Sequence, residues 1–204
     1  NSPIIAITGS NGKTTTVTAL HKMCQTKSLK GKLGGNVGTP FSSNVLDEII
    51  QKEQNNLHIL EISSFQMETI IHFKPNICVF LNISPDHLNR HRTIEEYIKM
   101  KLNMAKNLNK DDSIVYNIDD NKLKDSFKNY SAKQIPFSIS ISNTAICVNG
   151  TKIKDSNGNI LINKKDIAMP GEHNLLNLLA AATAAKLVKI PNEKIAKVFK
   201  SFTG

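Results

Sequence analysis

The chain has 204 residues and a formal net charge of +9, and 40% of its residues are hydrophobic, which favours a sizeable core and excludes wholesale disorder. Only Arg90 and Arg92 are arginines, and the lysines are scattered along the chain. We therefore expect no nucleic-acid partner, because readers of nucleic acids rely on arginine, and we interpret the charge as suited to a polyanionic small substrate.

The apolar segments are too short for a membrane protein. None approaches the roughly 18 residues that a membrane span needs, and no signal peptide is recognisable, so we expect no membrane partner. Cys24, Cys78 and Cys147 lie in apolar contexts without metal-ligand spacing, which predicts reduced, buried cysteines in a cytoplasmic protein. We expect both ends of the chain, Asn1 and Gly204, to be cut from something longer.

Short apolar runs alternate with helical patterns over the first 130 residues or so. Strands are predicted at 3–8, 57–63, 76–83 and 113–117. Helices are predicted at 13–28, 43–53, 64–73, 93–108 and 119–128. The glycine-rich stretch 32–40 is expected to be a loop, and Thr93 with Glu96 has the pattern of a capping box. The alternation predicts an α/β fold with a doubly wound, mostly parallel sheet.

The pattern changes beyond about residue 134. Segments 135–141, 145–153 and 158–169 have the character of short antiparallel strands, with a two-residue hairpin turn at Asn157–Gly158. Two helices follow, at 171–188 and 192–202. We therefore expect a small antiparallel β region toward the C-terminal third.

The segment TGSNGKTT has the compressed pattern Gly-x-x-Gly-Lys-Thr of a phosphate-binding loop between a strand and a helix. Its glycines allow a tight turn, and backbone N–H groups at a helix start favour an anion. Lys13 is expected to reach the β- and γ-phosphates of ATP, and the Thr14 hydroxyl to bind Mg²⁺. The predicted nucleotide-binding residues here are Gly9, Ser10, Asn11, Gly12, Lys13, Thr14 and Thr15.

Polar residues also follow the next buried strands. Glu61 ends an apolar strand, where a carboxylate is costly unless a cation such as Mg²⁺ compensates it; the alternative is a solvent-facing strand edge. His87, beside Asp86, is either a surface residue or a ligand for metal or phosphate. Since ligands bind beyond the carboxyl ends of parallel strands, we expect Glu61 and His87 near the phosphate loop. Asn174 and Asn177 share one helix face that could hydrogen-bond adenine or face solvent.

Seven segments in order, TGSNGKTT, GGNVG, LEISSFQMET, NISPDHLNRH, YIKMKLNMAKN, YNIDD and GEHNLLNLLAA, resemble the central ATPase domain of the Mur ligases. The resemblance covers essentially the whole chain, and Phe65 with Gln66 favours the D-glutamate-adding member. It implies an ATP-dependent ligase, expected to be monomeric, that acts on UDP-N-acetylmuramoyl-L-alanine and D-glutamate through an acyl phosphate. It also implies two flanking domains outside residues 1–204, without which we expect nucleotide binding but no turnover.

Matching motifs imply roles for single residues. Lys101 corresponds to the family lysine that CO₂ carbamylates, which gives a carboxylate-like ligand for a hard cation; without the resemblance it is an ordinary helix-surface lysine. The implied catalytic residues are Lys13, Glu61, His87 and Lys101. The implied ligands of two Mg²⁺ ions are Thr14, Glu61, His87 and carbamylated Lys101. The implied substrate contacts are Asn36, Ser63 and Ser64 for the UDP-sugar peptide, and Asn174 and Asn177 for adenine.

Three alternatives stay open from the sequence. A sister Mur ligase would add another amino acid, an ATP-binding module would bind nucleotide without catalysis, and a basic nucleic-acid binder would use the lysines for phosphate contacts.

Overall fold

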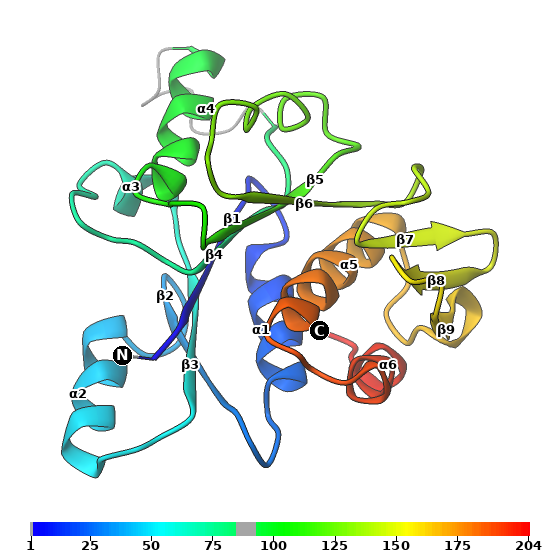
Figure 1. Cartoon of the computed structure of the whole chain (residues 1–204), viewed down its shortest axis with the longest axis horizontal. Coiled ribbons are helices and arrows are strands. Elements are labelled where there is room, and N and C mark those ends of the chain that lie inside the picture. The colour runs from blue at the N-terminus through cyan, green and yellow to red at the C-terminus, as the bar shows by residue number, and fades with distance from the viewer. Residues whose placement is uncertain (1, 85–92) are drawn as a thin grey trace.

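The structure is a computed structural model that describes residues 2–84 and 93–204. Within those residues the chain forms one nine-stranded sheet in the order β2-β3-β1-β4-β5-β6-β7-β8-β9 (Figure 1). Its strands are β1 (Ile4–Thr8), β2 (Lys30–Gly35), β3 (Asn56–Glu61), β4 (Ile77–Phe80), β5 (Ser113–Asn117), β6 (Lys133–Ser138), β7 (Ile146–Asn149), β8 (Lys152–Asp155) and β9 (Ile160–Asn163). The pairs from β2 through β7 are parallel, and β7-β8 and β8-β9 are antiparallel. The predicted fold class is confirmed.

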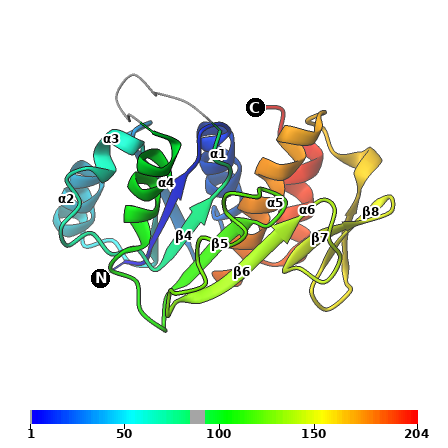
Figure 2. The same ribbon diagram turned by 90° about the horizontal axis from the view of Figure 1, so that it is seen from above.

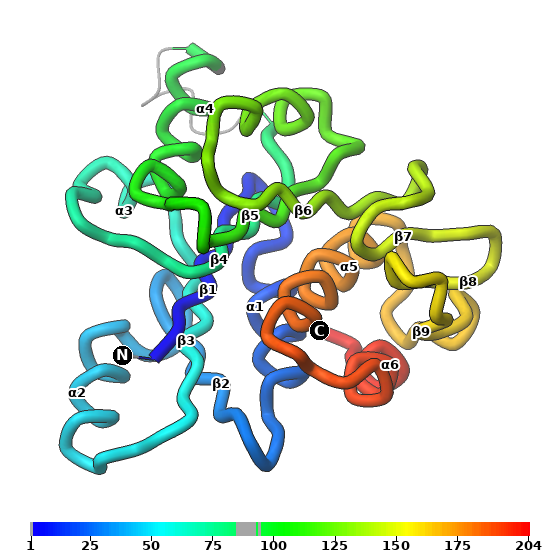
Figure 3. Tube along the Cα trace, in the orientation of Figure 1, coloured from blue at the N-terminus to red at the C-terminus, as the bar shows by residue number. Residues whose placement is uncertain are grey.

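Helices cover both faces of the parallel part. They are α1 (Lys13–Met23), α2 (Phe41–Gln51), α3 (Ser64–Met67), α4 (Ile94–Leu102), α5 (Glu172–Leu187) and α6 (Asn192–Ser201). Helices α1, α5 and α6 lie on one face and α3 and α4 on the other, while α2 flanks the β2 edge, as Figure 2 shows from above and the Cα trace of Figure 3 shows without ribbons. Within the described residues, no helix is long and apolar enough to span a bilayer.

Two hydrophobic cores lie on the two faces of the sheet. Successive side chains of a strand point to opposite faces, so Ile5 and Ile7 join the core under α1 and α5, whereas Ala6 joins the core under α4. Burial on both faces explains why these strands read as continuous apolar runs in the sequence. The cysteines are buried free thiols, as predicted, and burial raises the pKa of Cys24 to about 12.

Two sequence-based assignments were wrong. The stretch 32–40 is not all loop, because β2 runs through Gly35 as an edge strand parallel to β3. The glycines made this strand look like a loop in the sequence, but at Gly34 glycine is needed for packing. A Cβ there would lie 2.5 Å from the Thr39 carbonyl oxygen. The predicted helix 119–128 is a series of turns, in which the Asp120 carboxylate accepts from Lys122 N at 2.9 Å and closes a local turn instead.

The remaining differences concern boundaries and pairing. Helix α1 ends at Met23 rather than near residue 28, α3 is one turn long, and α4 ends at Leu102 before a short 3₁₀ turn. Thr93 caps α4 as predicted by accepting from Glu96 N. Strand β6 was expected to be antiparallel but extends the parallel sheet, since it pairs with β5. The Asn157–Gly158 turn joins β8 to β9, as part of a longer connection.

A substitution in helix α5 can test how tightly the core under α1 and α5 is packed. The helix is hydrophobic on nearly every side, as expected of a buried helix, and it packs against α1 and the sheet. Ala181 is fully buried in it. We expect Ala181→Leu to lower the free energy of unfolding by about 1–3 kcal/mol, because a close-packed core has no room for the larger side chain. Urea denaturation measures this. The same change at half-exposed Ala196 of α6 is the control, and equal losses in both variants would contradict the packing argument.

Candidate functional site

The candidate site lies at the carboxyl end of β1, an interior strand between β3 and β4. Helix α1 leaves β1 along one face, whereas α3 and α4, which follow β3 and β4, lie on the other face (Figure 1). Parallel α/β sheets bind ligands at such points. Ile7 pairs with Glu61 of β3, and Thr8 pairs with Phe80 of β4, so the ends of three strands meet at one level.

The loop between β1 and α1 is a tight turn that leads directly into a helix start. It turns at Gly12, whose φ is +82° and which directly precedes α1. A Cβ at Gly12 would lie 2.1 Å from Asn177 Oδ1, so glycine lets the loop and α5 approach each other. The first N–H groups of α1 have no intrahelical partner, and its first turn contains no acidic residue. The predicted residues Gly9 through Thr15 thus form a tight loop and a helix start that favour phosphate.

Two lysines from different helices converge on this loop. Lys13 Nζ donates to the Gly9 and Ser10 carbonyls at 2.9 and 3.1 Å. Lys101 Nζ, from α4, donates to the same Gly9 oxygen at 3.1 Å and lies 4.6 Å from the centre of the Tyr97 ring. Lys101 is only 2% exposed, so it is not an ordinary helix-surface lysine. Two ammonium groups at one carbonyl make the loop strongly cationic, which suits a polyphosphate.

A buried carboxylate lies at the start of α1. Glu61 is 2% exposed; its Oε2 accepts from Thr14 Oγ1 and its Oε1 accepts from Asn36 Nδ2, both at 2.8 Å. Both donors are neutral, and hydrogen bonds from neutral groups compensate a buried charge only in part. A carboxylate beside a hydroxyl is a set of hard oxygen donors of the kind that Mg²⁺ prefers. These residues therefore fit a magnesium ion, and the solvent-facing alternative for Glu61 is excluded.

The described residues contain only part of the predicted metal site. Within the described residues no group of three or more His, Cys, Asp or Glu side chains could hold a metal. His87 and Asp86 lie outside the described residues, so the prediction that His87 joins Glu61 stays a prediction.

The residues predicted to contact the substrate and adenine differ in burial and in hydrogen-bond partners. Asn36 lies at the site, where it donates to Glu61. Ser63 caps α3 in a capping box with Gln66, and Ser64 is 4% exposed. Asn174 is half-buried and donates to the Pro170 carbonyl at 2.6 Å, whereas Asn177 is buried against the phosphate loop. The two asparagines therefore have different surroundings.

Sequence reasoning missed two polar residues at the site. The Tyr97 hydroxyl lies 3.1 Å from Ser10 Oγ, and the Asn82 side chain bonds to the backbone of Asn11 at 2.9 and 3.1 Å. Both had a signal. Tyr97 stands one helical turn before Lys101, and Asn82 is the first polar residue after a buried apolar strand.

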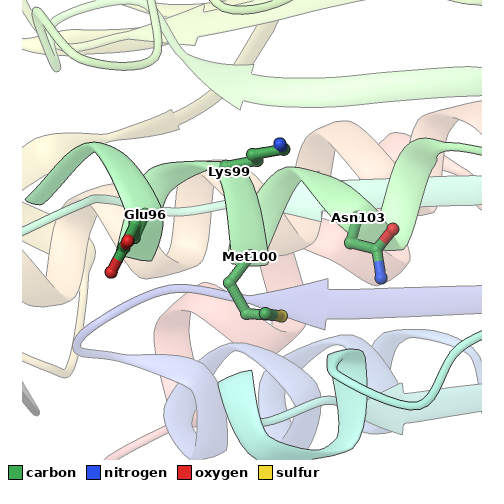
Figure 4. Close-up of a pocket in the computed structure, with 4 residues that line it drawn as sticks. All are labelled: Glu96, Lys99, Met100 and Asn103. Carbon is green, nitrogen blue, oxygen red and sulfur yellow. The ribbon is translucent and has the colours of Figure 1, made fainter. Parts of the chain in front are cut away.

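The face of α4 that carries Lys99 does not belong to the candidate site. A pocket of about 380 Å³ there is lined by Glu96, Lys99, Met100 and Asn103. Figure 4 shows these four side chains on α4. Lys99 is exposed, whereas Lys101 is buried beside the phosphate loop, so Lys99 serves as a control for Lys101.

Comparisons with known proteins agree with this geometry. The Mur ligase middle domain family matches residues 7–185. The UDP-N-acetylmuramoylalanine–D-glutamate ligase of Thermoanaerobacter sp. (strain X514) is 40% identical over 212 residues, which cover 100% of this chain and 45% of that protein. The enzyme of the same name from Staphylococcus epidermidis is 40% identical over 207 residues, covering 100% and 44%. The chain thus spans less than half the length of these curated relatives.

Solved structures share the fold at lower identity. A UDP-N-acetylmuramoyl-L-alanyl-D-glutamate–2,6-diaminopimelate ligase superposes with a TM-score of 0.78 at 21% identity, over 100% of this chain and 47% of that one. The MurF ligase of Thermotoga maritima, solved in complex with ADP, superposes with a TM-score of 0.70 at 18% identity, over 96% and 48%.

The charge of Glu61 can be tested without any assay of catalysis. In the wild type, Mg²⁺ with ATP should raise the free energy of unfolding, by about 2.7 kcal/mol at a hundredfold excess over the dissociation constant. We expect Glu61→Gln to lose most of this gain, because the amide keeps the shape but cannot neutralise a cation. Thermal unfolding with and without Mg²⁺ measures it. Glu193→Gln, at an exposed position on α6, should respond like the wild type, and full stabilisation of Glu61→Gln would refute the metal assignment.

Proposed function

The chain belongs to the Mur ligase family, and from this premise we propose that it is the nucleotide-binding domain of an ATP-dependent ligase that joins D-glutamate to UDP-N-acetylmuramoyl-L-alanine. The observation that carries the proposal is that two lysines and a buried carboxylate lie around one loop. Lys13 and Lys101 converge on the Gly9 carbonyl, and Glu61 holds Thr14 at the start of α1. Residues 1–204 would then form the central domain, with the other domains of the enzyme outside them.

In the proposed reaction the alanyl carboxylate attacks the γ-phosphorus of ATP, and ADP leaves with the bridging oxygen. The amine of D-glutamate then attacks the acyl phosphate, loses a proton, and forms an amide as inorganic phosphate departs. The first step brings two anions together, so it depends on positive charge placed around the transferring phosphoryl group.

The residues of this chain would supply that charge. The N–H groups at the start of α1 would hold the phosphates. Lys13, now bound to two loop carbonyls, would turn to the phosphate oxygens. Thr14 and Glu61 would hold Mg²⁺, which when bound neutralises phosphate charge as a Lewis acid. Asn36 would keep the Glu61 carboxylate oriented.

Lys101 has a second proposed role, as the site of a carbamate. The ammonium would first lose a proton, and the neutral amine would then add to CO₂, forming an N–C bond and releasing a second proton. The net change turns a cation into an anion. The burial of Lys101 beside the phosphate loop supports this, since an anion there could serve as a ligand for a second Mg²⁺ ion.

The choice of D-glutamate rests on the names of the relatives and on the Phe65–Gln66 pair. A sister ligase of the same family would accept another amino acid. Assaying the complete enzyme with D-glutamate, L-alanine and a diamino acid decides between them. The expectations of a monomeric, cytoplasmic enzyme that binds no nucleic acid stay predictions.

Lys13 is the first residue to test. In the complete enzyme, Lys13→Ala should lose about 3 kcal/mol of transition-state stabilisation, more than a hundredfold in turnover, as single-donor losses do elsewhere. Steady-state kinetics with ATP measures this. Lys27→Ala, at an exposed lysine beyond α1, should keep wild-type turnover, and turnover of Lys13→Ala near that control would remove Lys13 from the reaction.

Lys101 requires a rescue experiment. We expect Lys101→Ala to be inactive in the complete enzyme and to regain part of its activity with added short carboxylic acids, which replace the lost carbamate. Lys99→Ala, on the outer face of the same helix, should be active and indifferent to the acids. If Lys101→Ala were as active as that control, the carbamate would have no role.

A further inference from the structure

We propose that Asn82 is a positioning residue that holds the phosphate loop in its anion-binding shape. The inference rests on the proposed function of that loop as the nucleotide site. Asn82 lies just after β4 and is half-buried. Its Oδ1 accepts from Asn11 N at 2.9 Å, and its Nδ2 donates to Asn11 O at 3.1 Å. One carboxamide therefore satisfies both backbone groups of one loop residue, as a neighbouring strand would.

The main chain of the same segment extends this pairing to the next residue of the loop. The Asn82 carbonyl accepts from Ser10 N at 3.1 Å. Ser84 N donates to Ser10 Oγ at 3.0 Å, and that hydroxyl lies 3.0 Å from Ser84 O. The exit of β4 thus continues the sheet beyond its last residue and fixes two consecutive residues of the loop.

The bond to Asn11 N decides which N–H groups are left for phosphate. Asn11 N–H is used inside the protein, so it cannot bind a ligand while Asn82 holds it. The donors that follow, at Gly12, Lys13 and Thr14, open α1 and have no intrahelical partner. Because Asn82 binds Asn11 N–H, the backbone N–H groups left for a ligand begin at Gly12, at the start of α1, where the helix dipole is strongest.

The segment that contains Asn82 is itself held by residues that follow β5, the strand on the other side of β4. The next residue, Ile83, is 4% exposed, and both of its backbone groups are fixed by side chains that follow β5. Ile83 N donates to Asp120 Oδ2 at 2.8 Å, and Lys122 Nζ donates to Ile83 O at 2.9 Å. Since β1, β4 and β5 are neighbours in the sheet, the three exits form one continuous brace. A braced side chain can impose a geometry on the loop, whereas a mobile one could not.

The test compares binding of two probes, MgATP and magnesium tripolyphosphate, to the 204-residue chain by titration calorimetry. We expect Asn82→Ala to weaken both by the same factor, about 10- to 100-fold, because two hydrogen bonds that shape the phosphate donors are lost. Asn82→Asp should weaken both as well, since its carboxylate faces the Asn11 carbonyl that needs a donor. Equal losses for the two probes place the effect at the phosphates.

Asn107→Ala is the matched control. Asn107 is also half-buried, and its Nδ2 donates to two backbone carbonyls, of Ile71 and Phe73, both at 2.9 Å and away from the loop. It should lower the unfolding temperature as Asn82→Ala does but leave both affinities unchanged. A folded Asn82→Ala with wild-type affinity for MgATP, or a loss confined to MgATP, would overturn the inference; if Asn82→Ala does not fold, Asn82→Asp decides by the same criteria.

The two proposals fail differently. A wild-type chain that binds neither probe would overturn the proposed nucleotide site and this inference with it. A wild-type chain that binds both, beside an Asn82 variant that binds them equally well, would overturn the role of Asn82 alone.

Discussion

The negative charge of Glu61, enclosed beside neutral donors, is the constraint on which the site depends. Among the residues that the structure describes, the Glu61 carboxylate accepts hydrogen bonds from a hydroxyl and an amide, and two neutral donors compensate a buried charge only in part. A cation at this point removes the imbalance. The surrounding structure keeps the carboxylate in place meanwhile, because Glu61 pairs with Ile7 in the sheet and Asn36 N donates to its carbonyl at 2.8 Å.

The opposite imbalance lies at the phosphate loop. Lys13 and Lys101 both donate to the Gly9 carbonyl, so two positive charges lie close together at the loop. An excess of positive charge and a separate excess of negative charge, on the same edge of the sheet, match a polyphosphate carrying a divalent metal. Each half of that ligand would neutralise one half of the site.

The fold makes this arrangement possible by ending three parallel strands at one level. The turn after β1 then supplies the loop, the last residue of β3 supplies the carboxylate, and the segment after β4 supplies the amide of Asn82, all without long connections. The same arrangement explains the cost of the site. Charged groups and unpaired hydrogen-bond donors would destabilise a hydrophobic core. They lie instead at the strand ends, which the close-packed cores on the two faces of the sheet hold rigidly.

The sequence by itself determined the parallel sheet and the glycine turn between β1 and α1, and it singled out Glu61 as a candidate, because apolar period and glycine spacing are local signals. It did not determine β2, whose glycines hide a strand, nor the turns at 119–128, where Asp120 prefers a local turn to a helix. Only the tertiary structure decided that Lys101 is buried rather than exposed, that Asn174 and Asn177 differ, and that Asn82 braces the loop. Those facts depend on contacts between residues far apart in the chain, and the pattern within a single helix or strand carries no information about its partner.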